Sequence, residues 1–286
     1  MRFHPMIFRV AIICLLSVCI TFHAHSQKGK FYALVYKYKE GDKYRITTST
    51  YKNFSTTSQS YNNSFSGETS FDLYQEVEGA DDEACDMKVR FELTRHTENG
   101  KNMTYKLPGV FKGDELMLTF DRFGKILPKS IEYHSGDSTN ARAQEQLSLF
   151  RNIFIPLPDR ALKTGDTWDV SDVFDEDQLN ILAGSSYGMK KPDVRGQYLL
   201  ESVEDGKAKI ALDLEISGNG RLSELRDSAE FDILLRITGT FNFDVVNGKV
   251  LDGNINTEAA GVTKIGQQKV DFKGSLMSTF TIEKYK

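Results

Sequence analysis

The chain has 286 residues and a formal net charge of −4, with 40% hydrophobic and 27% charged residues. A mildly acidic chain has no general electrostatic attraction for nucleic acid or for an anionic membrane surface. Of its three cysteines only Cys85 lies beyond residue 26, so the rest of the chain is not a scaffold stapled by internal disulfides.

Residues 1–26 have the layout of a secretory signal peptide. Arg2 precedes an apolar run that also contains Arg9, and Ala24 and Ser26 place small residues at positions −3 and −1 of a cleavage site. We therefore expect export and cleavage, which lowers the net charge from −4 to −6 because both arginines leave. A retained anchor is disfavoured because the apolar run is short for a membrane span. The mature protein is expected in the periplasm, on the envelope or outside the cell, without a transmembrane segment.

Two pairs of similar stretches predict an internal duplication. Lys39–Thr47 (KEGDKYRIT) is repeated as Lys163–Ser171 (KTGDTWDVS), and Thr119–Leu127 (TFDRFGKIL) is followed at nearly the same offset by Asn242–Leu251 (NFDVVNGKVL). Because the two stretches recur in the same order and after nearly the same number of residues, the chain is expected to contain two repeated units. Each unit is too long for a solenoid repeat. Glycine followed by aspartate suits a tight turn, so these motifs carry information about the fold rather than about catalysis.

Apolar and polar residues alternate along several stretches, including 87–93 and 208–216, which is typical of antiparallel strands with one buried face. We expect a mainly β protein. It would be a curved antiparallel sheet or a partly open barrel built from two similar halves, with one or two short helices between them. The first β half would cover 27–135, a connecting helix and Pro-rich loop 136–160, and the second β half 161–286.

Helix is predicted only near the centre of the chain. Asn140 can cap a helix that ends at Phe154, and a second short helix fits 171–183. The apolar face of the first helix comprises Ala143, Leu147, Phe150 and Phe154. The polar stretch 47–70 fits either a long exposed hairpin or a mobile loop.

No motif indicates a particular chemistry. Gly184–Gly188 (GSSYG) matches the nucleophile elbow, but that motif needs a later histidine, and His96 and His134 both lie upstream. The two histidines lie too far apart in the sequence to have the spacing of zinc ligands. The acidic clusters 81–83 and 175–177 lack the pattern of a calcium loop. A glycosidase-like pair of carboxylates stays open, although nothing singles one out. We expect no metal, no cofactor and no catalytic residue, and we favour a protein that is not an enzyme.

Three short motifs carry a resemblance to known sequences. They are Tyr38–Tyr44 (YKEGDKY), Pro156–Pro158 (PLP) and Gly165–Trp168 (GDTW). The chain resembles an uncharacterised family of exported bacterial β-rich proteins, a domain of unknown function of the Bacteroidetes type. The resemblance implies an exported β-rich protein and assigns no activity.

The favoured functional prediction is an exported, non-enzymatic envelope protein that binds an apolar or amphipathic ligand, such as a lipid, in a groove between sheet and helix. The candidate ligand-binding residues are Leu147, Phe150 and Phe154. The alternative is a structural or protein-interaction module of the envelope, with a filled core and no small ligand. An integral outer-membrane barrel is a third interpretation, disfavoured because the predicted strands are short.

Overall fold

The computed structural model divides the chain into two compact units, Met1–Phe31 and Tyr32–Lys286. The described residues are 29–104, 115–127, 132–134, 153–172, 189–222, 229–265 and 268–285. In the first unit only residues 29–31 are described, and they have no regular secondary structure. The second unit contains residues 32–135 of the first predicted β half and all of the second, 161–286.

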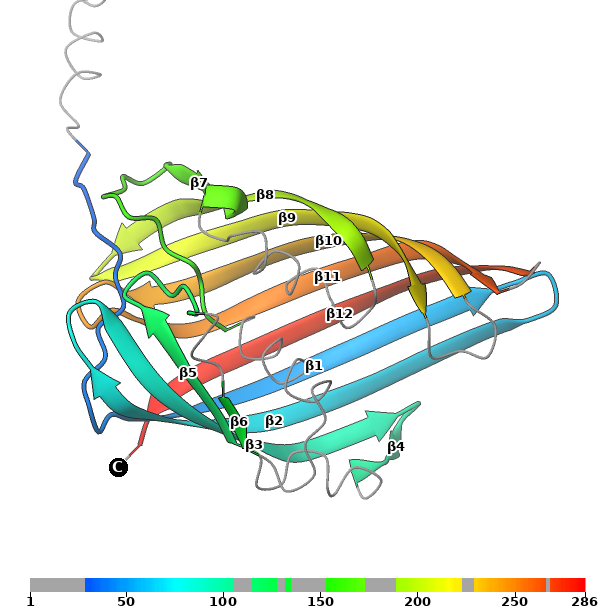
Figure 1. Cartoon of the computed structure of the whole chain (residues 1–286), viewed down its shortest axis with the longest axis horizontal. Helices are drawn as coiled ribbons and strands as arrows, with labels where there is room; N and C mark the ends of the chain where they lie inside the picture. The colour runs from blue at the N-terminus through cyan, green and yellow to red at the C-terminus, as the bar shows by residue number, and fades with distance from the viewer. Residues whose placement is uncertain are drawn as a thin grey trace, which may run out of the picture. The chain divides into compact units, whose positions relative to one another are not determined.

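The second unit is an antiparallel sheet (Figure 1). Its strands are β1 (Lys43–Thr57), β2 (Asn62–Ala80), β3 (Ala84–Glu98), β4 (Lys101–Asn102), β5 (Glu115–Asp121), β6 (Glu132–His134), β7 (Thr167–Asp169), β8 (Met189–Glu204), β9 (Lys207–Leu222), β10 (Ala229–Asp244), β11 (Lys249–Ile265) and β12 (Gln268–Lys284). Eleven of them follow the order β6-β5-β3-β2-β1-β12-β11-β10-β9-β8-β7, and β4 pairs with β3. The described sheet is therefore open, with β6 and β7 at its two ends, in agreement with the predicted mainly β fold.

The strand order places the first and the last long strand side by side. β1 pairs with β12 from Tyr44 opposite Lys284 to Thr57 opposite Asp271. On either side of this pair, the strands follow one another as in a meander. Pairing between opposite ends of the chain therefore joins the two meanders into one sheet.

The strands are longer than the sequence predicted. Eight of them contain 15 to 19 residues, so the prediction of short strands is wrong. The polar stretch 47–70 belongs to a hairpin, in which β1 and β2 are joined by a turn where Ser58 N donates to Tyr61 O. Thr, Tyr and Phe within this stretch favour extended backbone even where the apolar alternation is lost. The length of the strands therefore no longer argues against a membrane protein.

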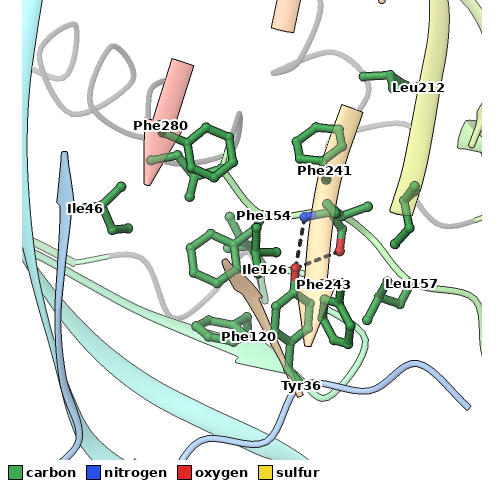
Figure 2. Packing of buried hydrophobic residues seen from close by; sticks show 14 of the residues in the cluster. Tyr36, Ile46, Phe120, Ile126, Phe154, Leu157, Leu212, Phe241, Phe243 and Phe280 are labelled. Atoms are coloured by element: carbon green, nitrogen blue, oxygen red, sulfur yellow. Dashed lines mark hydrogen bonds between the residues drawn. The ribbon is translucent and has the colours of Figure 1, made fainter. Parts of the chain in front are cut away.

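The sheet is strongly curved, because residues from distant strands meet in its core (Figure 2). The Tyr36 ring lies 6.1 Å from the ring of Phe120 on β5 and 5.5 Å from the ring of Phe243 on β10. Five strands separate β5 from β10 in the strand order. In a flat sheet these two strands would be about 29 Å apart, at the usual spacing of neighbouring strands. We call the face that carries Phe120 and Phe243 the inner face.

The predicted helices fall mostly outside the described residues. Of the helix ending at Phe154, only Ile153 and Phe154 are described, and they form a turn and an irregular segment. Of the helix predicted at 171–183, only the first two residues are described, and they belong to a 3-10 turn at Val170–Asp172. Both helices stay predictions.

Candidate functional site

One part of the inner face is filled by packed side chains. The Tyr36 hydroxyl donates a hydrogen bond to Ile155 O at 3.1 Å and accepts one from Ile155 N at 3.0 Å (Figure 2). Burial raises the pKa of Tyr36 far above its ordinary value. The ring of Phe154 lies 5.0 Å from the ring of Phe120 and is 7% exposed. Phe154 is therefore part of a packed aromatic cluster, whereas Leu147 and Phe150 lie outside the described residues.

The proline motif and the tryptophan motif contact each other beside this cluster. Trp168 Nε1 donates a hydrogen bond to Pro156 O at 3.0 Å, and the Trp168 ring stacks on Tyr198 of β8 at 5.3 Å. Leu157 N donates to Phe123 O at 2.8 Å. These contacts fix the segment after Phe154 against β7, β8 and the turn that follows β5, so the structure gives these motifs a packing role.

Farther along the long strands, the inner face is apolar but only partly covered. Two adjacent rows cross β2, β1, β12, β11 and β10, and we call them the distal rows. The first row consists of Phe65, Phe54, Gly274, Ala259 and Leu235, and the second consists of Gly67, Lys52, Leu276, Thr257 and Ile237. The partly exposed side chains of the distal rows are Phe54, Phe65, Lys52, Leu235, Ile237, Thr257 and Leu276. Five neighbouring strands span about 19 Å.

The rings of this face lie over glycines on the neighbouring strand. A side chain at Gly274 would overlap Phe54, and one at Gly261 would overlap Phe272. A β-carbon at Gly253 would come within 2.8 Å of Phe280. Glycine within a strand often marks such a close approach, and a ring across it restores the lost packing.

A polar row separates the filled part of the inner face from the distal rows on β1, β2 and β12. Thr50 Oγ1 and Ser278 Oγ are 2.9 Å apart and share a hydrogen bond. Beside them, Thr69 Oγ1 lies 3.0 Å from Nδ1 of the buried His96, whose Nε2 lies 3.2 Å from Glu98 Oε1. The sequence alone did not single out this cluster, because the side-chain periodicity does not show which strands are neighbours.

The outer face of the same strands is polar. Its side chains on β1, β11 and β12 include Thr47, Ser49, Asn53, Asp252, Asn254, Glu258, Thr279 and Thr281. A groove of about 490 Å³ crosses this face, lined among others by Asn53, Arg236, Glu258 and Lys273. The Arg236 side chain is already paired with Glu215 at 3.4 Å. The sheet therefore has one apolar and one polar face, as the alternation predicted.

A second hollow, of about 500 Å³, lies where residues 35–38 pass the β2–β3 turn. Asp81 Oδ1 accepts hydrogen bonds from Glu83 N and Ala84 N, and these bonds hold the pKa of Asp81 below its ordinary value. Cys85 is buried behind this turn, and burial raises the pKa of its thiol to about 12. The acidic cluster 81–83 thus forms a turn, and the thiol is not poised for chemistry. Among the described residues, no three His, Cys, Asp or Glu side chains gather as they would around a metal ion.

Comparison with known proteins gives little guidance. No family model matches the chain, and the search of curated proteins found no match. An outer membrane channel from Pseudomonas putida F1 aligns at 7% identity with a TM-score of 0.21, covering 91% of this chain and 100% of the channel. Pseudomonas aeruginosa OpdQ aligns at 6% identity with a TM-score of 0.22, covering 85% of this chain and 99% of its own. At these TM-scores we base no inference on the likeness. Within the described part of the chain, no helix has the length and hydrophobicity of a membrane span.

Proposed function

We propose that the protein is an exported, non-enzymatic envelope protein that binds an apolar or amphipathic ligand on the inner face of its sheet. The observation that carries this proposal is the pair of distal rows. Five of their apolar side chains, those of Phe54, Phe65, Leu235, Ile237 and Leu276, stay partly exposed, whereas Ile46 and Phe280 on the same face are buried. An apolar face that the fold leaves partly uncovered is the usual setting for a ligand of the same character.

The outer face supports the same proposal. Strands that face lipid carry apolar side chains outward, whereas the outer positions here are mostly hydroxyl, amide and charged side chains. Water is therefore the natural neighbour of the outer face, and the inner face is the place for an apolar ligand. Export itself rests on residues 1–26, and membership of the exported family rests on the motifs that begin at Tyr38, Pro156 and Gly165.

The second candidate is a structural or protein-interaction module of the envelope. The packed cluster of Tyr36, Phe120, Phe154 and Phe243 favours it, because that part of the inner face is closed by side chains. Leu147, Phe150 and Phe154 stay the predicted ligand contacts from the central segment. If Phe150→Asp prevents folding instead of uptake, the central segment belongs to the core.

We also propose that the sheet consists of two similar halves, and matching hydrogen bonds support this. Gly41 N donates to Val77 O, and Val77 N donates back to Asp42 O. In the second half, Gly165 N donates to Leu200 O, and Leu200 N donates back to Asp166 O. The φ angles of the two glycines are 82° and 92°, so both Gly-Asp pairs form the same kind of turn beside the next long strand.

Uptake of a fluorescent fatty acid by the delipidated protein without residues 1–26 tests the binding function. Leu276 faces inward in a distal row, and its neighbour Met277 faces outward and is 55% exposed. We expect Leu276→Ser to weaken uptake roughly fivefold, because part of an apolar contact is lost, and Met277→Ser to leave it unchanged. Circular dichroism and urea unfolding serve as controls for folding. No uptake by the unmutated protein would reject the binding function in favour of the structural module.

A further inference from the structure

The distal rows contain one basic side chain, that of Lys52. It belongs to the inner face because it shares the parity of Ile46 and Phe54 along β1. Among the inner-face positions described for β1, β2 and β9 to β12, the other basic side chain is Lys284. Lys284 Nζ contacts Asp42 next to the start of β1. Lys52 is therefore the cation that a molecule lying on the distal rows would meet.

Within the distal rows the neighbours of Lys52 are apolar, and on its other side lies the polar row of Thr50, Thr69 and Ser278. Its Nζ lies 5.4 Å from the centroid of the Phe65 ring, in position for a cation–π contact. Its Cε would be 3.3 Å from a β-carbon at Gly67, so the lack of a side chain there leaves room for the lysine stem. On the neighbouring strand β12, the residue opposite Lys52 is Leu276. The position thus combines a half-buried lysine with a ring and an aliphatic side chain.

Lys52 has no ion-pair partner among the described residues, in contrast to the other basic residues of its strand. Lys43 Nζ lies 2.8 Å from Glu76 Oε1, and Arg45 Nη2 lies 2.6 Å from Asp72 Oδ2. The carboxylate of Glu98, which lies on β3 in the same row as Lys52, is within hydrogen-bond distance of His96 Nε2. A charge on an apolar face is costly unless it is paired. An anion from outside the chain would supply the missing partner.

We propose that Lys52 pairs with the anionic headgroup of an amphipathic ligand whose single acyl chain lies along the distal rows. This inference rests on the proposed binding function and adds the chemical class of the ligand, a long-chain carboxylate. The carboxylate accepts a charge-assisted hydrogen bond from the Lys52 ammonium group. The chain contacts the apolar side chains on β12 and β10, of which Leu276 and Ile237 continue the row of Lys52.

The test compares two probes on delipidated protein without residues 1–26, a pyrene-labelled hexadecanoic acid and its methyl ester. The unmutated protein should bind the acid about tenfold more tightly than the ester, since a charge-assisted hydrogen bond contributes at least this much. Lys52→Met should remove this preference by weakening only acid binding, and Lys52→Arg should keep it. Lys273→Met is the matched control, because Lys273 lies on the outer face of β12 and should not affect either probe.

The outcomes separate this inference from the binding function. Equal affinities of the unmutated protein for acid and ester overturn the role of Lys52 while leaving apolar binding in place, and this result does not depend on the folding of any variant. Binding of neither probe overturns both proposals. Acid binding that survives in a folded Lys52→Met protein also overturns the role of Lys52.

Discussion

Tyr36 and Ile155 are joined by two hydrogen bonds, one in each direction, between a side-chain hydroxyl and one backbone residue. This pair fixes the segment after Ile153 on the aromatic cluster of the inner face. Because both residues are buried, neither partner can replace its hydrogen bonds with bonds to bulk water.

Tyr36→Phe should therefore lower the free energy of unfolding by about 1–3 kcal/mol, the usual cost of leaving buried backbone groups without a partner. Urea unfolding measures this change. Tyr51→Phe is the control, because Tyr51 is 47% exposed and should change stability little. Equal effects of the two substitutions would show that the Tyr36 hydroxyl does not hold the segment.

Gly274→Val should destabilise the protein by about 1–3 kcal/mol, since the new side chain overlaps the Phe54 ring and overpacks the face. In the double variant with Phe54→Ala, the cost of Gly274→Val should be smaller, because the overlapping ring is gone. A thermodynamic cycle of the four proteins measures this coupling. Strictly additive effects would contradict the contact between Phe54 and Gly274.

Cys85 should not react with a thiol reagent at pH 8 while the protein is folded. Burial raises the pKa of the thiol to about 12, so almost no thiolate is present, and access is blocked as well. The test uses protein without residues 1–26 and an aromatic disulfide reagent, which releases a coloured thiolate when it reacts with a cysteine. The absorbance of this thiolate should appear only after denaturant is added. Rapid labelling in native buffer would indicate that the β2–β3 turn opens readily.

Protonation of Asp42 should lower the free energy of unfolding of the protein in acid. Burial raises its pKa, but hydrogen bonds from Lys284 and Tyr44 outweigh burial and lower the pKa below its ordinary value of 3.8. A carboxyl group with a depressed folded-state pKa stabilises the protein above the unfolded-state pKa, and this stabilisation is lost as the pH falls through the folded-state pKa. Urea midpoints measured from pH 7 to below pH 4 should therefore drop less steeply for Asp42→Asn. Parallel curves for the two proteins would contradict this role of Asp42.

Export should remove the first 26 residues, so that the mature protein begins at Gln27. Mass spectrometry of the N-terminal peptide from cell fractions checks the cleavage position. A full-length form held in the inner membrane would instead indicate that residues 1–26 are a retained anchor.

The sequence predicted the strand faces and the turns well, because both depend on local patterns. Met87 and Phe91 are buried as their alternation with charged neighbours predicted, and Gly41 and Gly165 occupy the expected turns. The strand lengths were missed because Ser- and Thr-rich segments can continue a strand without an apolar period. The isolation of Lys52 could not be predicted, since it depends on which residues of β2, β3 and β12 lie beside β1.

The pairing of β1 with β12 determines when the sheet can be completed. β1 is the first long strand of the sheet to be synthesised and β12 the last, so contacts such as that of Thr50 with Ser278, 228 positions apart, cannot form before β12 is made. Contacts between strands this far apart in sequence slow folding. Until β12 arrives, one edge of β1 has open hydrogen-bonding groups and can pair with another molecule. Aggregation therefore competes with folding most strongly just before the last strand joins the sheet.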